Sequence, residues 1–470
     1  MIKLEGLARS NLWGLPCSND IFLIPFIYSP SMFKKPKLYY VLSHTLPTGE
    51  RFPVLINNET GIPPVLSLRY SLSRRSRGGA ARLTSLLRGL SDLYEWCEKV
   101  PKVNLDELIT SGRLISLHWL ERALTDLDII NNMKGPKEGL DGQLGPTGNG
   151  SARAHNRRIR AWEDFLLWAL YPKNYQSCYQ PESDPEGKKD RRERRVELEL
   201  FFSNARKPEP ASVHHSGLSS EELEAIMVAI GPDEQGSFPE SGFSENTRRR
   251  NWTMYSVGRW GGLRRGEILK LKTCDVPRRV KDEFTGQMVY TSHEIQVVRR
   301  PDDPDDPRTS RTPSVKRHSR AVVLPETLLD DLNAYIDERG VAGFKASYLF
   351  TSETGSPLSI ERADNIIKQI GRYAASVFEE RHPGVQHSLH ELSWHRLRYT
   401  RAKELLPEFL EAGPIGLDEF LEYFGWVSLE SAAPYVKEFH RERATARIRD
   451  INTRLTNDSL AVKGKKTTRE

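Results

Sequence analysis

The chain has 470 residues, too many for one ordinary hydrophobic core and enough for two or three domains. Its 69 lysines and arginines exceed its 63 aspartates and glutamates, and the net charge of +6 favours an anionic partner without requiring one. The four cysteines are scattered, which argues against a zinc site or a disulfide framework. No secretory signal and no run of the ~18 apolar residues that a membrane span needs can be found. We therefore expect a soluble cytoplasmic protein with reduced thiols and no membrane partner.

Residues 1–72 are expected to be rich in β-strand. Apolar and aromatic runs occupy residues 21–28 and 38–42, and turn-forming residues follow at 48–50 and 57–61. Pro25 interrupts the first run and restricts it to an edge strand at most. The segment is either a small appended domain or a strand-rich cover on the next domain.

Residues 73–205 have helical periodicity instead. Apolar side chains recur at intervals of three and four residues over 83–97, 117–127 and 159–170, as on the buried faces of amphipathic helices. A Gly-rich polar stretch at 134–151 is expected to be a loop. The region is therefore predicted to be a helical domain.

Three basic clusters surround this helical region. Any one of them, taken alone, is best read as a solvated face. Three clusters around one small domain indicate a surface that contacts a DNA backbone. The candidate DNA-binding residues are Arg74, Arg75, Arg153, Arg157, Arg158, Lys188, Lys189, Arg191 and Arg192.

The second half of the chain begins after a predicted linker at 206–218, which contains prolines, histidines and small residues. Ser219 and Glu222 have the spacing of a capping box, so a helix is expected to start there. This domain is predicted to extend over 219–455. A basic, polar and flexible tail is predicted at 456–470.

Two stretches of this domain carry arginines suited to binding phosphate. A predicted helix ends at Gly261 and Gly262, and the tight turn that they allow can aim Arg264 into a cleft. Arg265 would then face elsewhere. On these residues alone, Arg264 could equally be a surface arginine at a helix start. Farther along, His395 and Arg398 are three residues apart on one helical face. A histidine and an arginine held together can bind a phosphate and move a proton beside it.

A hairpin is predicted between these stretches. Residues 288–298 and 321–325 contain β-formers, and the proline- and aspartate-rich segment at 301–314 must be a loop. Lys316 lies just before the returning strand. Taken alone, Lys316 could equally be an exposed loop lysine.

The last part of the pattern is aromatic. An apolar helical stripe at 417–424 ends at Gly425 and Trp426, and Tyr435 follows nine residues after Trp426. The indole N–H of Trp426 could donate a hydrogen bond to a phosphate oxygen. Both aromatic side chains could also simply be core residues.

Taken in order, Gly262-Leu263-Arg264-x-x-Glu267, His395-x-x-Arg398 and the Trp426–Tyr435 spacing resemble the tyrosine recombinase (phage integrase) family. The resemblance implies a multidomain protein. A mainly α-helical core-binding domain would precede an α+β catalytic domain with a small antiparallel sheet, and the β-rich segment would precede both. It implies a catalytic set made of Arg264, Lys316, His395, Arg398, Trp426 and the nucleophile Tyr435. Tyr399, Tyr423 and His390 are rivals by composition, but they do not fit the family's pattern.

The implied activity is DNA cutting and rejoining through a 3′-phosphotyrosyl intermediate. Two arginines would stabilise the charge of the transition state, His395 would act as the base, and Lys316 would protonate the leaving 5′-oxygen. The arginine field and His395 would together activate the tyrosine, and Glu267 would orient its neighbours. The mechanism needs no metal, no ATP and no other cofactor.

The implied partner is double-stranded DNA, bound by a homo-tetramer during strand exchange and by a monomer or dimer otherwise. An accessory DNA-bending or directionality protein is a possible second partner, and the location would be the nucleoid. Integration, excision or transposition of a mobile element, or resolution of dimers, would each fit. A type IB topoisomerase and a catalytically decayed DNA-binding protein are the alternative functions.

Overall fold

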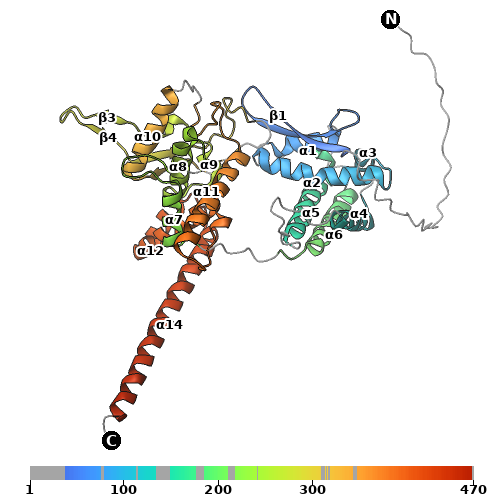
Figure 1. Ribbon diagram of the computed structural model, residues 1–470. Helices are drawn as coiled ribbons and strands as arrows, with labels where there is room; N and C mark the ends of the chain where they lie inside the picture. The colour runs from blue at the N-terminus through green and yellow to red at the C-terminus, as the bar shows by residue number, and fades with distance from the viewer. Residues whose placement is uncertain are drawn as a thin grey trace, which may run out of the picture.

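The computed structural model describes residues 37–75, 79–112, 115–133, 149–175, 185–209, 217–240, 242–308, 313, 315, 318–341 and 347–467. Within them, one hydrophobic core is formed by side chains between Tyr39 and Phe202. Two further clusters, from Leu218 to Leu397 and from Tyr399 to Tyr435, form the C-terminal part. We call these parts the helical domain and the C-terminal domain (Figure 1).

The helical domain begins with an antiparallel hairpin of β1 (Tyr39–Thr45) and β2 (Arg51–Asn57). This confirms the predicted strand near residue 40 and both turns, whereas the strand predicted at 21–28 lies outside the described residues. Tyr39 and Leu55 are buried in the same core as the helices, so the hairpin is a cover on this domain and not a domain of its own. The first helix of the domain starts at Val65, whereas the helical region was predicted to begin at residue 73.

The helices of this domain pack closely around α2 and α5. A Cβ atom on Gly89 of α2 would lie 2.6 Å from the Cβ atom of Ala161 on α5, so glycine permits the close approach. Trp162 is fully buried beside it and donates a hydrogen bond to the carbonyl of Gly89 at 2.8 Å. The elements are α1 (Val65–Arg74), α2 (Ala80–Lys99), α3 (Leu105–Thr110), α4 (Leu117–Met133), α5 (Asn149–Ala169), η2 (Pro172–Asn174) and α6 (Pro185–Ala205).

The C-terminal domain is organised around α8, most of whose side chains are buried. The predicted capping box is present, because Ser219 and Glu222 exchange side-chain hydrogen bonds at the start of α7. The helices are α7 (Ser220–Ile230), α8 (Glu245–Trp260), α9 (Arg265–Ile268), η4 (Thr273–Asp275), α10 (Glu326–Val341), α11 (Ile360–Arg381), η5 (Leu389–Glu391), α12 (Trp394–Glu411), α13 (Gly413–Tyr423) and α14 (Leu429–Thr467).

Two short antiparallel pairs complete this domain. Strand β5 (Glu294–Val297) pairs with β6 (Arg320–Val323), as predicted. The prediction of one continuous strand over 288–298 is wrong, because the chain bends at 291–293 and the first part, β4 (Met288–Tyr290), pairs with β3 (Arg279–Lys281). The fold class is therefore as expected, mainly helical with small antiparallel sheets.

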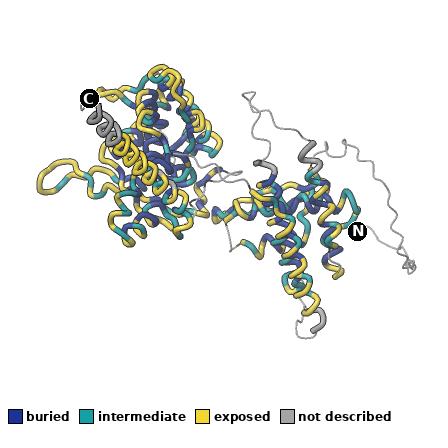
Figure 2. The backbone as a smooth tube through the Cα atoms, turned by 90° about the horizontal axis from the view of Figure 1, so that it is seen from below, coloured by how far each residue is buried: buried dark blue, intermediate teal, exposed yellow. Residues whose placement is uncertain are grey.

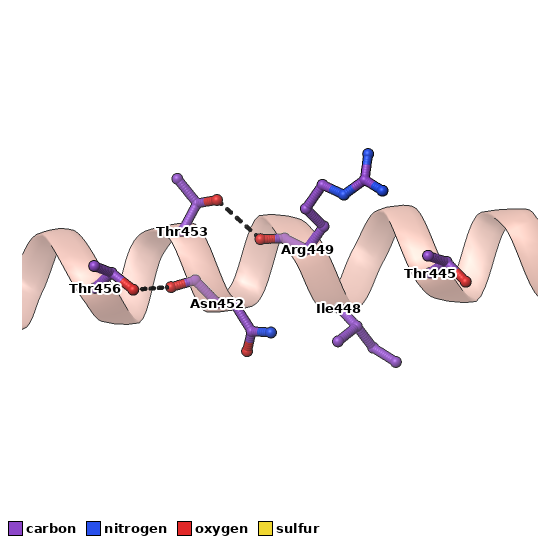
Figure 3. Close-up of a pocket in the computed structure, with 6 residues that line it drawn as sticks. All are labelled: Thr445, Ile448, Arg449, Asn452, Thr453 and Thr456. Carbon is purple, nitrogen blue, oxygen red and sulfur yellow. Dashed lines mark hydrogen bonds between the residues drawn. The ribbon is translucent and has the colours of Figure 1, made fainter. Parts of the chain in front are cut away.

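Helix α14 extends away from the rest of the domain (Figure 1) and is exposed along most of its described length (Figure 2). Figure 3 shows a shallow depression on this helix, where Thr453 donates a hydrogen bond to the carbonyl of Arg449. Residues 456–467, where a basic, polar and flexible tail is predicted, belong to this helix. No described helix is both long enough and apolar enough to cross a membrane.

Candidate active site

Arg264 is held by the turn between α8 and α9. Gly262 has φ +58°, and a Cβ atom there would lie 2.7 Å from the Phe424 ring, so only glycine suits this position. Arg264 is the N-cap residue of α9, and its Nη1 donates to Oε1 of Glu267 at 2.8 Å. Its two Nη atoms also lie 3.3 Å from the carbonyls of Phe424 and Gly425.

Helix α12 brings Arg398 and His395 to the same place. Arg398 is 1% exposed, and it donates to the carbonyl of Gly262 at 2.7 Å and to the carbonyl of Phe424. Burial, together with repulsion from Arg264, lowers the pKa of Arg398 to about 9. His395 is exposed one turn earlier on the helix, and it lines the same cavity as Arg264 and Arg398.

Glu267 holds the arginines together. It is 1% exposed, and Arg320 donates to its two carboxylate oxygens at 3.0 and 2.8 Å. Arg398 Nη1 lies 4.0 Å from the same carboxylate. Burial alone would raise the pKa of Glu267, but hydrogen bonds from Arg320 and the charges of Arg398 and Arg264 lower it to about 2. Three guanidinium groups share one carboxylate, which leaves an excess of positive charge that suits a phosphate.

A cavity of about 570 Å³ opens beside these groups. Ala81, in the first turn of α2 in the helical domain, also lines the cavity, so both domains contribute to its wall. Its lining residues are Ala81, Arg264, Arg265, Gly266, Pro313, Ile360, Asp364, Ser393, Trp394, His395 and Arg398. Arg265 was expected to face elsewhere, but it lies on this wall, where it pairs with Asp364.

Trp426 connects the arginines to Tyr435. The Trp426 ring stacks on Phe424 at 4.8 Å, and the guanidinium carbon of Arg398 lies 4.9 Å from the same indole. The Tyr435 ring lies 4.9 Å from Trp426 and 4.6 Å from Tyr399, and it is 7% exposed. The tyrosine is therefore one aromatic ring away from Arg398.

Burial sets the ionisation of Tyr435 in this conformation. Desolvation raises the pKa of its phenol, and the nearby charges of Arg398 and Arg264 offset only part of this effect. In this packed arrangement the effect of burial on the phenol is larger than that of the two arginine charges.

The sequence pattern missed Arg320, which fixes Glu267 and also donates to the carbonyl of Tyr423 at 2.9 Å. An arginine at the start of a short strand gives no signal of such a role. Lys316 lies outside the described residues, although Pro313 is on the cavity wall. His390 lies 3.5 Å from Glu379, which also binds His387, and it is not among the residues that line the cavity.

The candidate DNA-binding residues differ in how far they are available to a ligand. Arg74 pairs with Asp164, Arg75 with Glu50, and Arg158 is buried beside Asp92, so these three guanidinium groups are engaged within the domain. Arg191 is half-buried, and the side chain of Lys188 lies outside the described residues. The exposed members are Arg153, Arg157, Lys189 and Arg192.

Comparison with known proteins gives matches among solved structures. The chain is similar to XerA recombinase, with 17% identity and a TM-score of 0.33 over 82% of this chain and 97% of that one. It is also similar to XerH site-specific recombinase in a post-cleavage complex with a palindromic difH substrate (16% identity, TM-score 0.44, 80% and 81% covered). A pre-cleavage complex of XerH with difH substrate matches with 15% identity and a TM-score of 0.44, over 80% of this chain and 82% of that one.

The matched proteins are described as recombinases, and XerH as a site-specific one. No protein-family model matches the sequence, and no curated protein matches it. Because identities and TM-scores are this low, the roles of individual residues rest on the geometry of this chain alone.

Proposed function

We propose that this protein is a site-specific DNA recombinase that cuts and rejoins DNA through a 3′-phosphotyrosyl intermediate. The observation that carries the proposal is the convergence of Arg264, Arg398 and His395 on one cavity, with Tyr435 one aromatic ring away. These residues come from α9, α12 and α14, so chance grouping along the sequence does not explain it.

The proposed reaction is an in-line displacement at one phosphodiester. Arg264 and Arg398 bind the non-bridging oxygens and stabilise the charge that develops on them. His395 accepts the proton of the Tyr435 hydroxyl as its oxygen bonds to phosphorus. The bond from phosphorus to the 5′-oxygen breaks, and Lys316 protonates that oxygen. A 5′-hydroxyl of another strand later attacks the phosphotyrosyl bond, which reverses these steps and frees Tyr435.

Strand exchange requires two duplexes, so we propose a homo-tetramer on DNA in the nucleoid, acting in integration, excision or transposition. A type IB topoisomerase would use the same chemistry and reseal the original strand. A decayed DNA-binding protein would need no such set, and the joint placement of Arg264, Arg398 and His395 argues against it.

A nicked suicide duplex tests the proposal. Its substrates are made from the DNA that flanks the gene. Each carries a nick just to the 3′ side of the phosphate under test, so that cleavage frees a short fragment with a 5′-hydroxyl, which diffuses away and cannot reverse the reaction. We expect a covalent protein–DNA adduct that survives denaturing electrophoresis and forms with a chelator present. A mobility shift without any adduct would support the decayed DNA-binding protein. A topoisomerase would be supported by a different result: the protein relaxes supercoiled plasmid that lacks the sequence found in the adduct, and it does not join two duplexes.

The exposed arginines of α5 provide a separate test of DNA contact. Arg153 and Arg157 are four residues apart on one exposed face. Changing both to alanine should weaken DNA binding about tenfold at moderate salt, and it should reduce the slope of log K against log salt by about 2. Arg122→Ala on α4, which removes an exposed arginine near Asp126, is the control. An unchanged slope in the double variant would contradict the assigned surface.

A further inference from the structure

Arg51 of the helical domain reaches into the C-terminal domain. Its side chain is 5% exposed. Its Nε donates to the carbonyl of Arg308 at 3.1 Å, and its Nη2 donates to the carbonyls of Asp306 and Arg308, both at 2.8 Å. The adjoining hairpin turn is just as close, since a Cβ atom on Gly49 would lie 2.5 Å from the backbone nitrogen of Pro304. The contact is therefore a built interface between the domains.

The segment that Arg51 contacts is tied by a buried carboxylate. The side chain of Asp306 is 0% exposed, and it accepts hydrogen bonds from Arg308 Nε and Lys270 Nζ, both at 2.7 Å. Burial opposes ionisation, but these partners lower the pKa of Asp306 to about 2. Asp306, Arg308 and Lys270 form what we call the Asp306 cluster.

Arg308 connects this cluster to two walls of the active-site cavity. Its Nη1 donates to the carbonyl of Leu269 at 3.1 Å and to that of Leu358 at 3.0 Å. Leu269 is the C-cap residue of α9, the helix that begins after Arg264. Leu358 lies two residues before Ile360, which starts α11 and lines the cavity.

Pro313, five residues after Arg308 in the sequence, also lines the cavity. We propose that Arg51 is a positioning residue for the reaction: it fixes the Asp306 cluster from the helical domain and thereby holds α9, α11 and the 303–308 segment in their relative positions. This proposal rests on the proposed function. It makes the N-terminal hairpin a functional part of the catalytic centre.

The physical basis is the number of buried groups that Arg51 satisfies. Without it, the carbonyls of Asp306 and Arg308 lose their donors in a site closed to water. Asp306 also loses the charge of Arg51, whose Nη2 lies 3.9 Å from its carboxylate, although it keeps Lys270 and Arg308. The loop should then open more often, and both walls anchored by Arg308 should open with it.

Hydrogen exchange of the DNA-free protein tests the connection without any reaction. We expect Arg51→Met to increase amide exchange about tenfold or more in peptides covering 269–272, 303–308 and 358–364, with α5 unchanged. Arg122→Met is the matched control within the helical domain. Unchanged exchange at 269–272 and 358–364 would overturn the proposal, because the cavity walls would then be independent of Arg51.

Single-turnover cleavage tests positioning. With saturating nicked duplex, Arg51→Met should form adduct about tenfold more slowly, while its Kd stays within about twofold of the wild-type value. Arg51→Lys keeps the charge but lacks the planar fork, so it should recover part of the rate, and it replaces the methionine variant if that one does not fold. A loss confined to Kd, or a wild-type rate, would overturn the proposal. If the wild-type protein forms no adduct, the proposed function fails, and exchange still decides whether Arg51 holds the walls.

Discussion

Replacing Tyr435 with phenylalanine is expected to abolish covalent attachment to nicked duplex DNA, by on the order of 10⁴-fold or more. The change removes the oxygen that would bond to phosphorus. It keeps the aromatic ring and so its contacts with Trp426 and Tyr399, and the fold should persist. DNA affinity should stay within about twofold of wild type, because under the proposed function the arginines, and not this hydroxyl, bind the phosphate. Adduct yield on denaturing gels and Kd from gel shift measure the two quantities.

Tyr399 provides the control for this substitution. Its ring lies against that of Tyr435, and its buried hydroxyl has no hydrogen-bond partner in the described structure. Tyr399→Phe should therefore fold normally and still form the adduct. An adduct from Tyr435→Phe, or its loss in Tyr399→Phe with normal folding, would contradict the assignment of the nucleophile.

Replacing Glu267 with glutamine is expected to lower the free energy of unfolding at pH 7 by about 3 kcal/mol. The carboxylate is 1% exposed and is shared by Arg264, Arg320 and Arg398, so a neutral amide leaves buried guanidinium groups without their counter-charge. Adduct formation should fall as well, because the two phosphate-binding arginines lose their common anchor. Denaturant titration at pH 7 and single-turnover cleavage measure these losses.

The role of Glu267 also predicts how the free energy of unfolding changes with pH. The pKa of Glu267 is lowered from 4.5 to about 2, so its ionisation stabilises the folded state above pH 4.5, and this contribution is lost as the pH falls from 4.5 toward 2. The shift corresponds to about 3 kcal/mol. The wild-type protein should therefore lose stability more steeply than Glu267→Gln in this range.

Asp364→Asn is the matched control, since it breaks the partly exposed pair with Arg265 on the same cavity wall. It should change stability by no more than about 1 kcal/mol. Equal losses in the two variants would contradict the anchoring role of Glu267.

The sequence allowed prediction of those parts of the site that depend on local pattern. Arg264 follows two glycines at a helix end, and His395 and Arg398 share one helical face, so their placement follows from turn chemistry and helical periodicity. The capping box at Ser219 was also predictable, because its partners are three residues apart.

Long-range contacts could not be predicted in this way. Arg51 bonds to residues more than 250 positions away, and Arg158 in a basic cluster is buried beside Asp92 of another helix. A count of charges cannot distinguish a guanidinium that faces solvent from one paired inside a domain. The break between β4 and β5 was missed for a related reason, since β4 pairs with β3, a strand that the sequence pattern did not indicate.

The packing of Tyr435 between Trp426 and Tyr399 has a consequence for fidelity under the proposed function. Under that function, a step that frees the ring from both neighbours would precede the bond between its oxygen and phosphorus, and a complex that dissociates before this step would not react. A duplex that stays bound for longer allows this release to occur before dissociation. Discrimination between sites can thus arise from dwell time as well as from affinity.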